Sequence, residues 1–189
     1  MTIREPGVAY SAGYAQYRGA PPPAPDTFRL TVDGIRWGDE RLSLPTNLGS
    51  VWRYYQRPAA VITHLIIHHS AGSPRGTARQ FASYHTQSKG WPGIGYHFVV
   101  RPGAVVYTGD ILTTRFHGGA CNPYSIGVCV PGNYEQDAVS DELIWTLRTL
   151  RAALMVHLGA ALVVRGHRDY MQTACPGRHL YARLGEIIA

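Results

Sequence analysis

The chain has 189 residues, of which 45% are hydrophobic and 16% charged, which suits one globular domain with its own core. Seventeen Arg and a single Lys against twelve acidic residues give a formal net charge of +6. That surplus favours an anionic partner, but no run of five or more basic residues occurs, so nucleic acid is not expected. Three cysteines, an odd count, argue against a disulfide framework.

The first residues bear on targeting. Met1–Ala20 lacks a charged segment followed by an apolar one, so we expect no secretory signal and a protein that is cytoplasmic on synthesis. No apolar run approaches the roughly 20 residues that cross a bilayer. The proline run Ala20–Pro25 favours an extended polyproline II tether.

A predicted hairpin follows the proline run. Thr27–Val32 alternates apolar and polar side chains, which predicts a strand. Asp33 and Gly34 form a strong hairpin-turn signal, and Ile35–Leu44 is the candidate partner strand. The hairpin would either pack on the main domain or form a small attachment to it.

From about Ala60 the chain alternates predicted strands and helices. The strands are expected at Val61–His69, Gly95–Val100, Ala104–Tyr107, Ser125–Val130 and Ala161–Gly166, and the helices at Thr77–Ser88, Asp141–Leu158 and Arg178–Ile188. The clearest helix has Ser140 as its N-cap and Gly159 as its stop. This order predicts an α/β fold, a central mixed β-sheet with helices packed on its faces. We assign it to residues 56–189, after an irregular N-terminal extension with the hairpin at residues 1–55.

Histidines and a cysteine occur where two predicted strands end. His68 and His69 close one strand, His167 follows another, and Cys175 comes eight positions after His167. Imidazole and thiolate are ligands that Zn²⁺ prefers. Because side chains alternate along a strand, only one of His68 and His69 can join His167 and Cys175, and alternation does not say which. Three protein ligands with an open fourth position are typical of hydrolytic zinc sites.

Four sequence motifs carry a resemblance to a known family. They are IIHHSA at 66–71, GWPGIGYHF at 90–98, NPYSIGV at 122–128, and GHRD running on to ACPG at 166–177. In this order and spacing they resemble the zinc-dependent N-acetylmuramoyl-L-alanine amidases of type 2, which include phage endolysins and animal peptidoglycan-recognition proteins. The resemblance covers roughly residues 61–188.

The resemblance implies a ligand set and a reaction. His68, His167 and Cys175 match the metal ligands, so it chooses His68 over His69 and implies one Zn²⁺ per chain. Tyr96 matches the catalytic Tyr. Thr173 stands where some phage members have Lys and many recognition-protein amidases have Thr. The implied reaction is hydrolysis of the amide between N-acetylmuramic acid and the L-alanine of the stem peptide.

The resemblance also implies a partner and a setting. His85, Trp91, His117 and Asn122 match positions that line the substrate groove in the family. The expected partner is peptidoglycan, with anionic envelope polymers attracted by the basic surface, and we expect a monomer that reaches the cell wall after release. Because cytoplasmic recycling members use Asp as third ligand, Cys175 favours the branch of endolysins and recognition proteins, within which we expect a phage or prophage endolysin. A recognition module without catalysis and a muropeptide-recycling amidase remain the alternatives.

Overall fold

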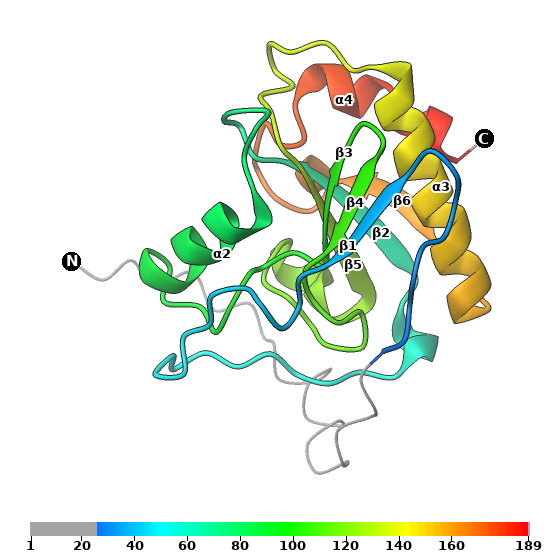
Figure 1. Cartoon of the computed structure of the whole chain (residues 1–189). Coiled ribbons are helices and arrows are strands. Elements are labelled where there is room, and N and C mark those ends of the chain that lie inside the picture. The colour runs from blue at the N-terminus through cyan, green and yellow to red at the C-terminus, as the bar shows by residue number, and fades with distance from the viewer. Residues whose placement is uncertain (1–25, 189) are drawn as a thin grey trace.

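The computed structural model describes residues 26–188, in which one sheet lies between helices (Figure 1). Its strands are β1 (Arg36–Asp39), β2 (His64–His69), β3 (Phe98–Arg101), β4 (Ala104–Tyr107), β5 (Ser125–Val130) and β6 (Val163–Gly166). Its helices are α2 (Ala78–Gln87), α3 (Asp141–Leu158) and α4 (Arg178–Ala182), with 3₁₀ turns at Ala59–Val61, Gly119–Tyr124, His167–Asp169 and Leu184–Ile187. The proline run Ala20–Pro25 lies outside the described residues.

The sheet is mixed, as predicted, with the strand order β1-β4-β3-β5-β2-β6. The four strands β3, β5, β2 and β6 are parallel neighbours. β4 returns antiparallel to β3, and β1 runs parallel to β4. Because β2, β5 and β6 share one direction, their carboxyl ends lie at the same edge, where α/β sheets place their ligand sites.

The two faces of the sheet are covered by different helices (Figure 1). The α3 face holds the larger core, which includes Leu65 and Ile67 of β2 packed with the leucines of α3. The α2 face holds a smaller cluster that includes Ala82, Val99 and Cys129. Since side chains alternate along β2, His68 lies on the α2 face.

The helix α3 has the predicted bounds and caps. The Ser140 hydroxyl accepts a hydrogen bond from the Leu143 N–H at 3.2 Å, and Gly159 ends the helix in the left-handed region at φ 64°. Among the helices in residues 26–188, none combines the length and the apolar character needed to cross a membrane.

The predicted N-terminal hairpin does not form. The turn at Asp33 and Gly34 is present, but Thr27–Val32 is not a strand, and β1 pairs in parallel with β4 instead. Phe28 and Leu30 are buried, at 4% and 3% exposure, so their alternation reflects an extended segment that places every second side chain in the α3-side core. An alternating pattern records burial and does not require a ladder of backbone hydrogen bonds.

Other predicted bounds also change, and β6 begins at Val163 instead of Ala161. β2 begins at His64 because Ala59–Val61 form a 3₁₀ turn, and β3 begins only at Phe98. The last helix is broken at Arg183, after which residues 184–187 form a 3₁₀ turn. Gly185 lies in that turn, and glycine is a poor helix former.

Candidate metal centre

Two neighbouring strands bring the first two candidate ligands together. The register of β2 and β6 pairs Ile67 with Gly166, so the residues that follow, His68 and His167, lie side by side at the carboxyl edge. Their ring centroids are 4.5 Å apart. The loop after β6 then returns to place Cys175 against them, and the candidate ligand atoms of the three residues all lie within 4.8 Å of one another.

The pleat of β2 separates the two adjacent histidines. His69 faces away from the cluster, and its Nδ1 accepts a hydrogen bond from the Tyr134 N–H at 3.1 Å. Its backbone still contributes, because the His69 N–H donates to the Cys175 Sγ at 3.4 Å. The member of the cluster that β2 supplies is therefore His68.

The spacing within the cluster fits a tetrahedral ion. The Cys175 Sγ lies 3.7 Å from the His68 Nδ1. An ion bound by nitrogen at about 2.1 Å and sulfur at about 2.3 Å, with a tetrahedral angle, would separate these two atoms by about 3.6 Å. The residue types thus suit Zn²⁺, and the distance between Cys175 and His68 matches that of two zinc ligands.

The loop that carries Cys175 is held by side chains from three directions. The Asp169 carboxylate accepts from the Gly166 N–H at 2.9 Å and from the Tyr181 hydroxyl at 2.6 Å. The Arg168 N–H donates to the Cys175 carbonyl at 2.9 Å, and the Arg168 guanidinium pairs with Glu135 at 3.1 Å. Cys175 is therefore fixed before any ion arrives.

Burial sets the protonation of the cluster. Burial first, and then the neighbouring imidazoles, hold the pKa of His68 well below 6.5, so its ring is neutral. Burial also lowers the pKa of His167. Burial raises the pKa of the Cys175 thiol to about 12, against the opposing effect of the His69 N–H. Metal binding would release this proton, since coordinated thiols are deprotonated.

Tyr96 and Thr173 each contact a member of the cluster. The Tyr96 ring is 5.4 Å from the His68 ring, and burial raises the pKa of its phenol well above 10.0, so it stays a hydrogen-bond donor. Thr173 is exposed, and its hydroxyl oxygen accepts from the Cys175 N–H at 3.2 Å, which leaves its proton free to donate.

Aromatic rings continue outward from Tyr96. The His85 ring lies 5.4 Å from Tyr96 and stacks on Trp91 at 4.8 Å, and Trp91 meets Phe116 at 5.6 Å. Phe116 in turn contacts Trp52, which is 52% exposed. We call these five residues the aromatic row. The sequence reasoning missed Phe116 and Trp52, because neither lies in a motif and only the fold aligns them.

Burial places three of the four predicted groove residues behind the surface. His85, His117 and Asn122 are 7%, 6% and 2% exposed. The His85 Nδ1 accepts from the Gly95 N–H at 3.1 Å, and the His117 Nδ1 lies 3.1 Å from the His68 Nε2. The Asn122 Oδ1 accepts from the His117 N–H at 3.1 Å. Their direct contact with a substrate stays a prediction, as it does for the more exposed Trp91.

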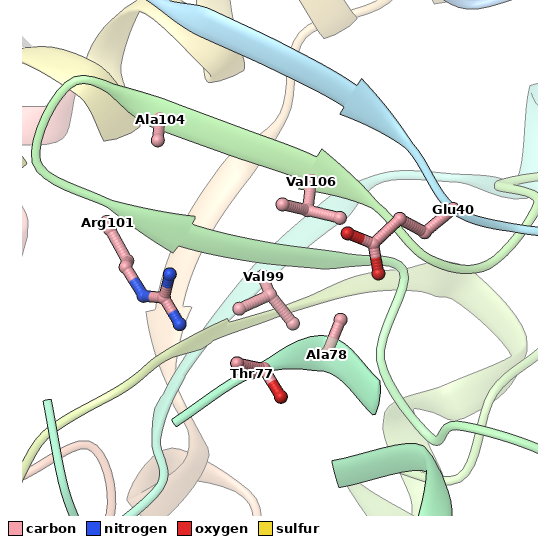
Figure 2. A pocket seen from close by; sticks show the side chains of 7 residues that line it. All are labelled: Glu40, Thr77, Ala78, Val99, Arg101, Ala104 and Val106. Carbon is pink, nitrogen blue, oxygen red and sulfur yellow. The ribbon is translucent and has the colours of Figure 1, made fainter. Parts of the chain in front are cut away.

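A small pocket of about 90 Å³ lies elsewhere on the α2 face (Figure 2). Figure 2 shows Val99 and Val106 of the β3–β4 hairpin facing the start of α2. Its full lining is Glu40, Thr77, Ala78, Val99, Arg101, Ala104 and Val106, so it includes no member of the candidate metal centre.

Comparison with known proteins gives the family. The model of the family described as N-acetylmuramoyl-L-alanine amidase matches residues 57–178, more than half of the chain. The chain belongs to this family. The resemblance predicted from the four motifs is therefore confirmed.

Similar family members come from animals and from a phage. The peptidoglycan-recognition protein SC1a of Drosophila melanogaster is 35% identical over 160 residues, covering 79% of this chain and 81% of the relative. The endolysin of Enterobacteria phage T3 is 30% identical over 128 residues, covering 64% of this chain and 83% of that protein. A solved Drosophila PGRP-LB mutant in complex with tracheal cytotoxin has a TM-score of 0.67 at 21% identity, covering 79% of this chain and 93% of that one, and it shares the fold.

Proposed function

We propose that the protein is a zinc-dependent N-acetylmuramoyl-L-alanine amidase that hydrolyses peptidoglycan, with His68, His167 and Cys175 as metal ligands. The observation that carries the proposal is the cluster of two imidazoles and a thiol within 4.8 Å, in a chain of the amidase family. Three protein ligands leave one coordination position open, as hydrolytic zinc sites require and filled structural sites do not.

The proposed reaction cleaves the amide between the muramic acid lactyl group and L-alanine. One water is consumed, and a lactyl carboxylate and a free L-alanine amine are released. Zinc, when bound, would supply an activated water and polarise the scissile carbonyl. Charge develops on the carbonyl oxygen, and the neutral Tyr96 phenol would donate a hydrogen bond to it. The exposed Thr173 hydroxyl would give a second, uncharged donor.

The surroundings of the cluster support peptidoglycan as the substrate. The aromatic row leads from His68 to Trp52, and the 52% exposed Trp52 ring suits contact with a sugar ring or a stem peptide. The net charge of +6 favours approach to an anionic envelope. A relative in the same family is a phage endolysin, and the third ligand is Cys175, which together favour an endolysin that acts on intact cell wall.

The products distinguish this activity from its alternatives. Zinc-loaded protein is incubated with purified sacculi and, separately, with soluble muropeptides, and a chelated sample serves as the control. The proposal expects new L-alanine amines from sacculi, without reducing sugar ends, and no release after chelation. Reducing ends would indicate cleavage of the glycan, and binding without release would indicate a recognition module. Cleavage of soluble fragments alone would indicate a recycling amidase.

A further inference from the structure

A line of buried hydrogen-bonding groups runs behind His68, away from Cys175. The His68 Nε2 lies 3.1 Å from the His117 Nδ1, and the His117 Nε2 lies 3.3 Å from the Ser125 Oγ. The Ser125 Oγ lies 2.6 Å from the Cys121 carbonyl oxygen. The three side chains are 1%, 6% and 0% exposed, so no solvent competes for these bonds.

The direction of each bond follows from the backbone end of the line. The Cys121 carbonyl can only accept, so the single Ser125 O–H donates to it. The Ser125 oxygen must then accept from the His117 Nε2–H. His117 is only 6% exposed, and burial disfavours a charged imidazole, so the ring holds a single proton, on Nε2, and its Nδ1 carries a lone pair. That lone pair can only accept the Nε2–H of His68.

We infer that Ser125 and His117 are positioning residues that hold His68 as its Nε2–H tautomer, which leaves the Nδ1 lone pair directed toward Cys175 and the ion. This inference rests on the proposed zinc site. The Nδ1 is the nitrogen that lies 3.7 Å from the Cys175 Sγ. A metal-binding histidine works best when its other nitrogen donates to a fixed acceptor, because that bond sets tautomer and ring orientation together. His117 would thus act through His68 and need not touch the substrate.

The surrounding residues are shaped to hold His117 in place. A Cβ on Gly127 would lie 2.4 Å from the His117 Cγ and 2.7 Å from its Nδ1, so only glycine leaves room for the ring on β5. Asn122 fixes the backbone by accepting from the N–H groups of His117 and Gly118, at 3.1 and 2.8 Å. Glycine inside a strand often marks such a close approach.

Within residues 26–188, the contact of the second ligand histidine is with a weaker acceptor. The His167 Nε2 lies 3.2 Å from the Met171 Sδ, a thioether that accepts only weakly, and Met171 is 45% exposed. The line of hydrogen bonds through His117 and Ser125, which we call the relay, therefore supports His68 and not His167. Loss of the relay should act on the metal site through His68.

The test reads the tautomers directly in metal-free protein. Long-range ¹H–¹⁵N NMR of the imidazole rings should show the His68 and His117 protons on Nε2 in the wild type. Ser125→Ala should redistribute the His117 proton and weaken zinc binding roughly 3- to 10-fold, and His117→Phe should weaken it roughly 10- to 100-fold. His117→Asn, whose Oδ1 can replace the Nδ1 as acceptor, should restore most of the affinity.

Thr146→Ala is the matched control for Ser125→Ala. The Thr146 hydroxyl is also fully buried, donates to a carbonyl (Glu142, 2.7 Å) and accepts one bond (Gly103 N–H, 3.0 Å), but it lies on α3. The inference is overturned if His68 carries its proton on Nδ1, or if Ser125→Ala binds zinc as tightly as Thr146→Ala. If the His117→Phe variant does not fold, the zinc affinity of Ser125→Ala still tests the inference. If the wild type binds no zinc, the proposed function fails, whereas normal zinc binding with an unaffected tautomer refutes the relay alone.

Discussion

Replacing Gly177 with alanine should disrupt the metal centre without touching a ligand. Gly177 has φ 90°, and a Cβ there would lie 2.3 Å from the Tyr134 carbonyl carbon and 2.7 Å from the Glu135 nitrogen. Both atoms are backbone and cannot rotate away. The first contact is about 1 Å short of the 3.4 Å at which ordinary contact begins, so the loop itself must move.

The expected magnitude follows from two effects. Gly177 combines φ 90° with ψ 143°, a region that is almost restricted to glycine and costs another residue about 1–3 kcal/mol, and overpacking against fixed atoms adds about 1–3 kcal/mol, so the loss of unfolding free energy should be roughly 2–6 kcal/mol. Cys175 lies two residues before Gly177. A shift of about 1 Å exceeds the roughly 0.2 Å tolerance of a zinc ligand distance, so zinc affinity should fall by at least about tenfold.

Gly159→Ala is the matched control. Gly159 also has a positive φ, 64°, but a Cβ there would meet nothing within 4 Å, so it should lose only about 1–2 kcal/mol and keep full zinc affinity. Urea unfolding and zinc competition against a chelator measure both quantities. Equal zinc affinity in the two variants would refute the argument that backbone contact at Gly177 fixes the ligand loop.

Three further predictions test separate parts of the structure. Tyr96→Phe should keep zinc affinity but lower kcat by about 10²–10³, and an unchanged kcat would exclude the phenol as an oxyanion donor. Because burial lowers the folded pKa of His85 to about 4, this ring should contribute about 3 kcal/mol of stability that is full above pH 6.5 and is lost toward pH 4; in urea unfolding series, His85→Gln should reduce the loss of stability over this range by about that amount, while the other buried histidines keep their share. Phe28→Ala should cost about 3–5 kcal/mol, because Phe28 packs on Trp37 and Phe98, and a loss below about 1 kcal/mol would mean that residues 26–30 are dispensable.

Much of the fold follows from local patterns, because the strongest patterns are also the buried ones. The sequence of α3 contains a start signal, a stop signal and a leucine stripe, and the observed bounds of the helix equal the predicted ones. The prediction of a hairpin from Thr27–Val32 was wrong because alternation shows only which side chains are buried. Tertiary contacts decide which strand becomes the partner. Here β4 takes β1 as its parallel neighbour, a pairing between distant segments that no local signal records.

The candidate site also has a part that the sequence predicts and a part that only the tertiary structure reveals. The candidate ligands His167, Cys175 and one of His68 and His69 could be found from the ends of two predicted strands, and the family resemblance then chose His68. The position of His117 could not, since its contact with His68 joins residues 49 apart through the packing of β5. The one available signal was Gly127, an unexplained glycine inside an apolar strand, which marks where the His117 ring crosses.

The central claim is that one zinc ion held partly by Cys175 hydrolyses the muramoyl amide. The most direct measurement is zinc content together with release of L-alanine amines from sacculi, for the wild type, Cys175→Ser and Cys121→Ser. Cys121 is the control because it is also a free, buried thiol, but its Sγ bonds the Gly118 carbonyl at 3.1 Å, outside the cluster. The account predicts one zinc and full activity in the wild type and Cys121→Ser, and loss of both in Cys175→Ser. A wild type without zinc, or a Cys175→Ser variant that keeps zinc and activity, would contradict it.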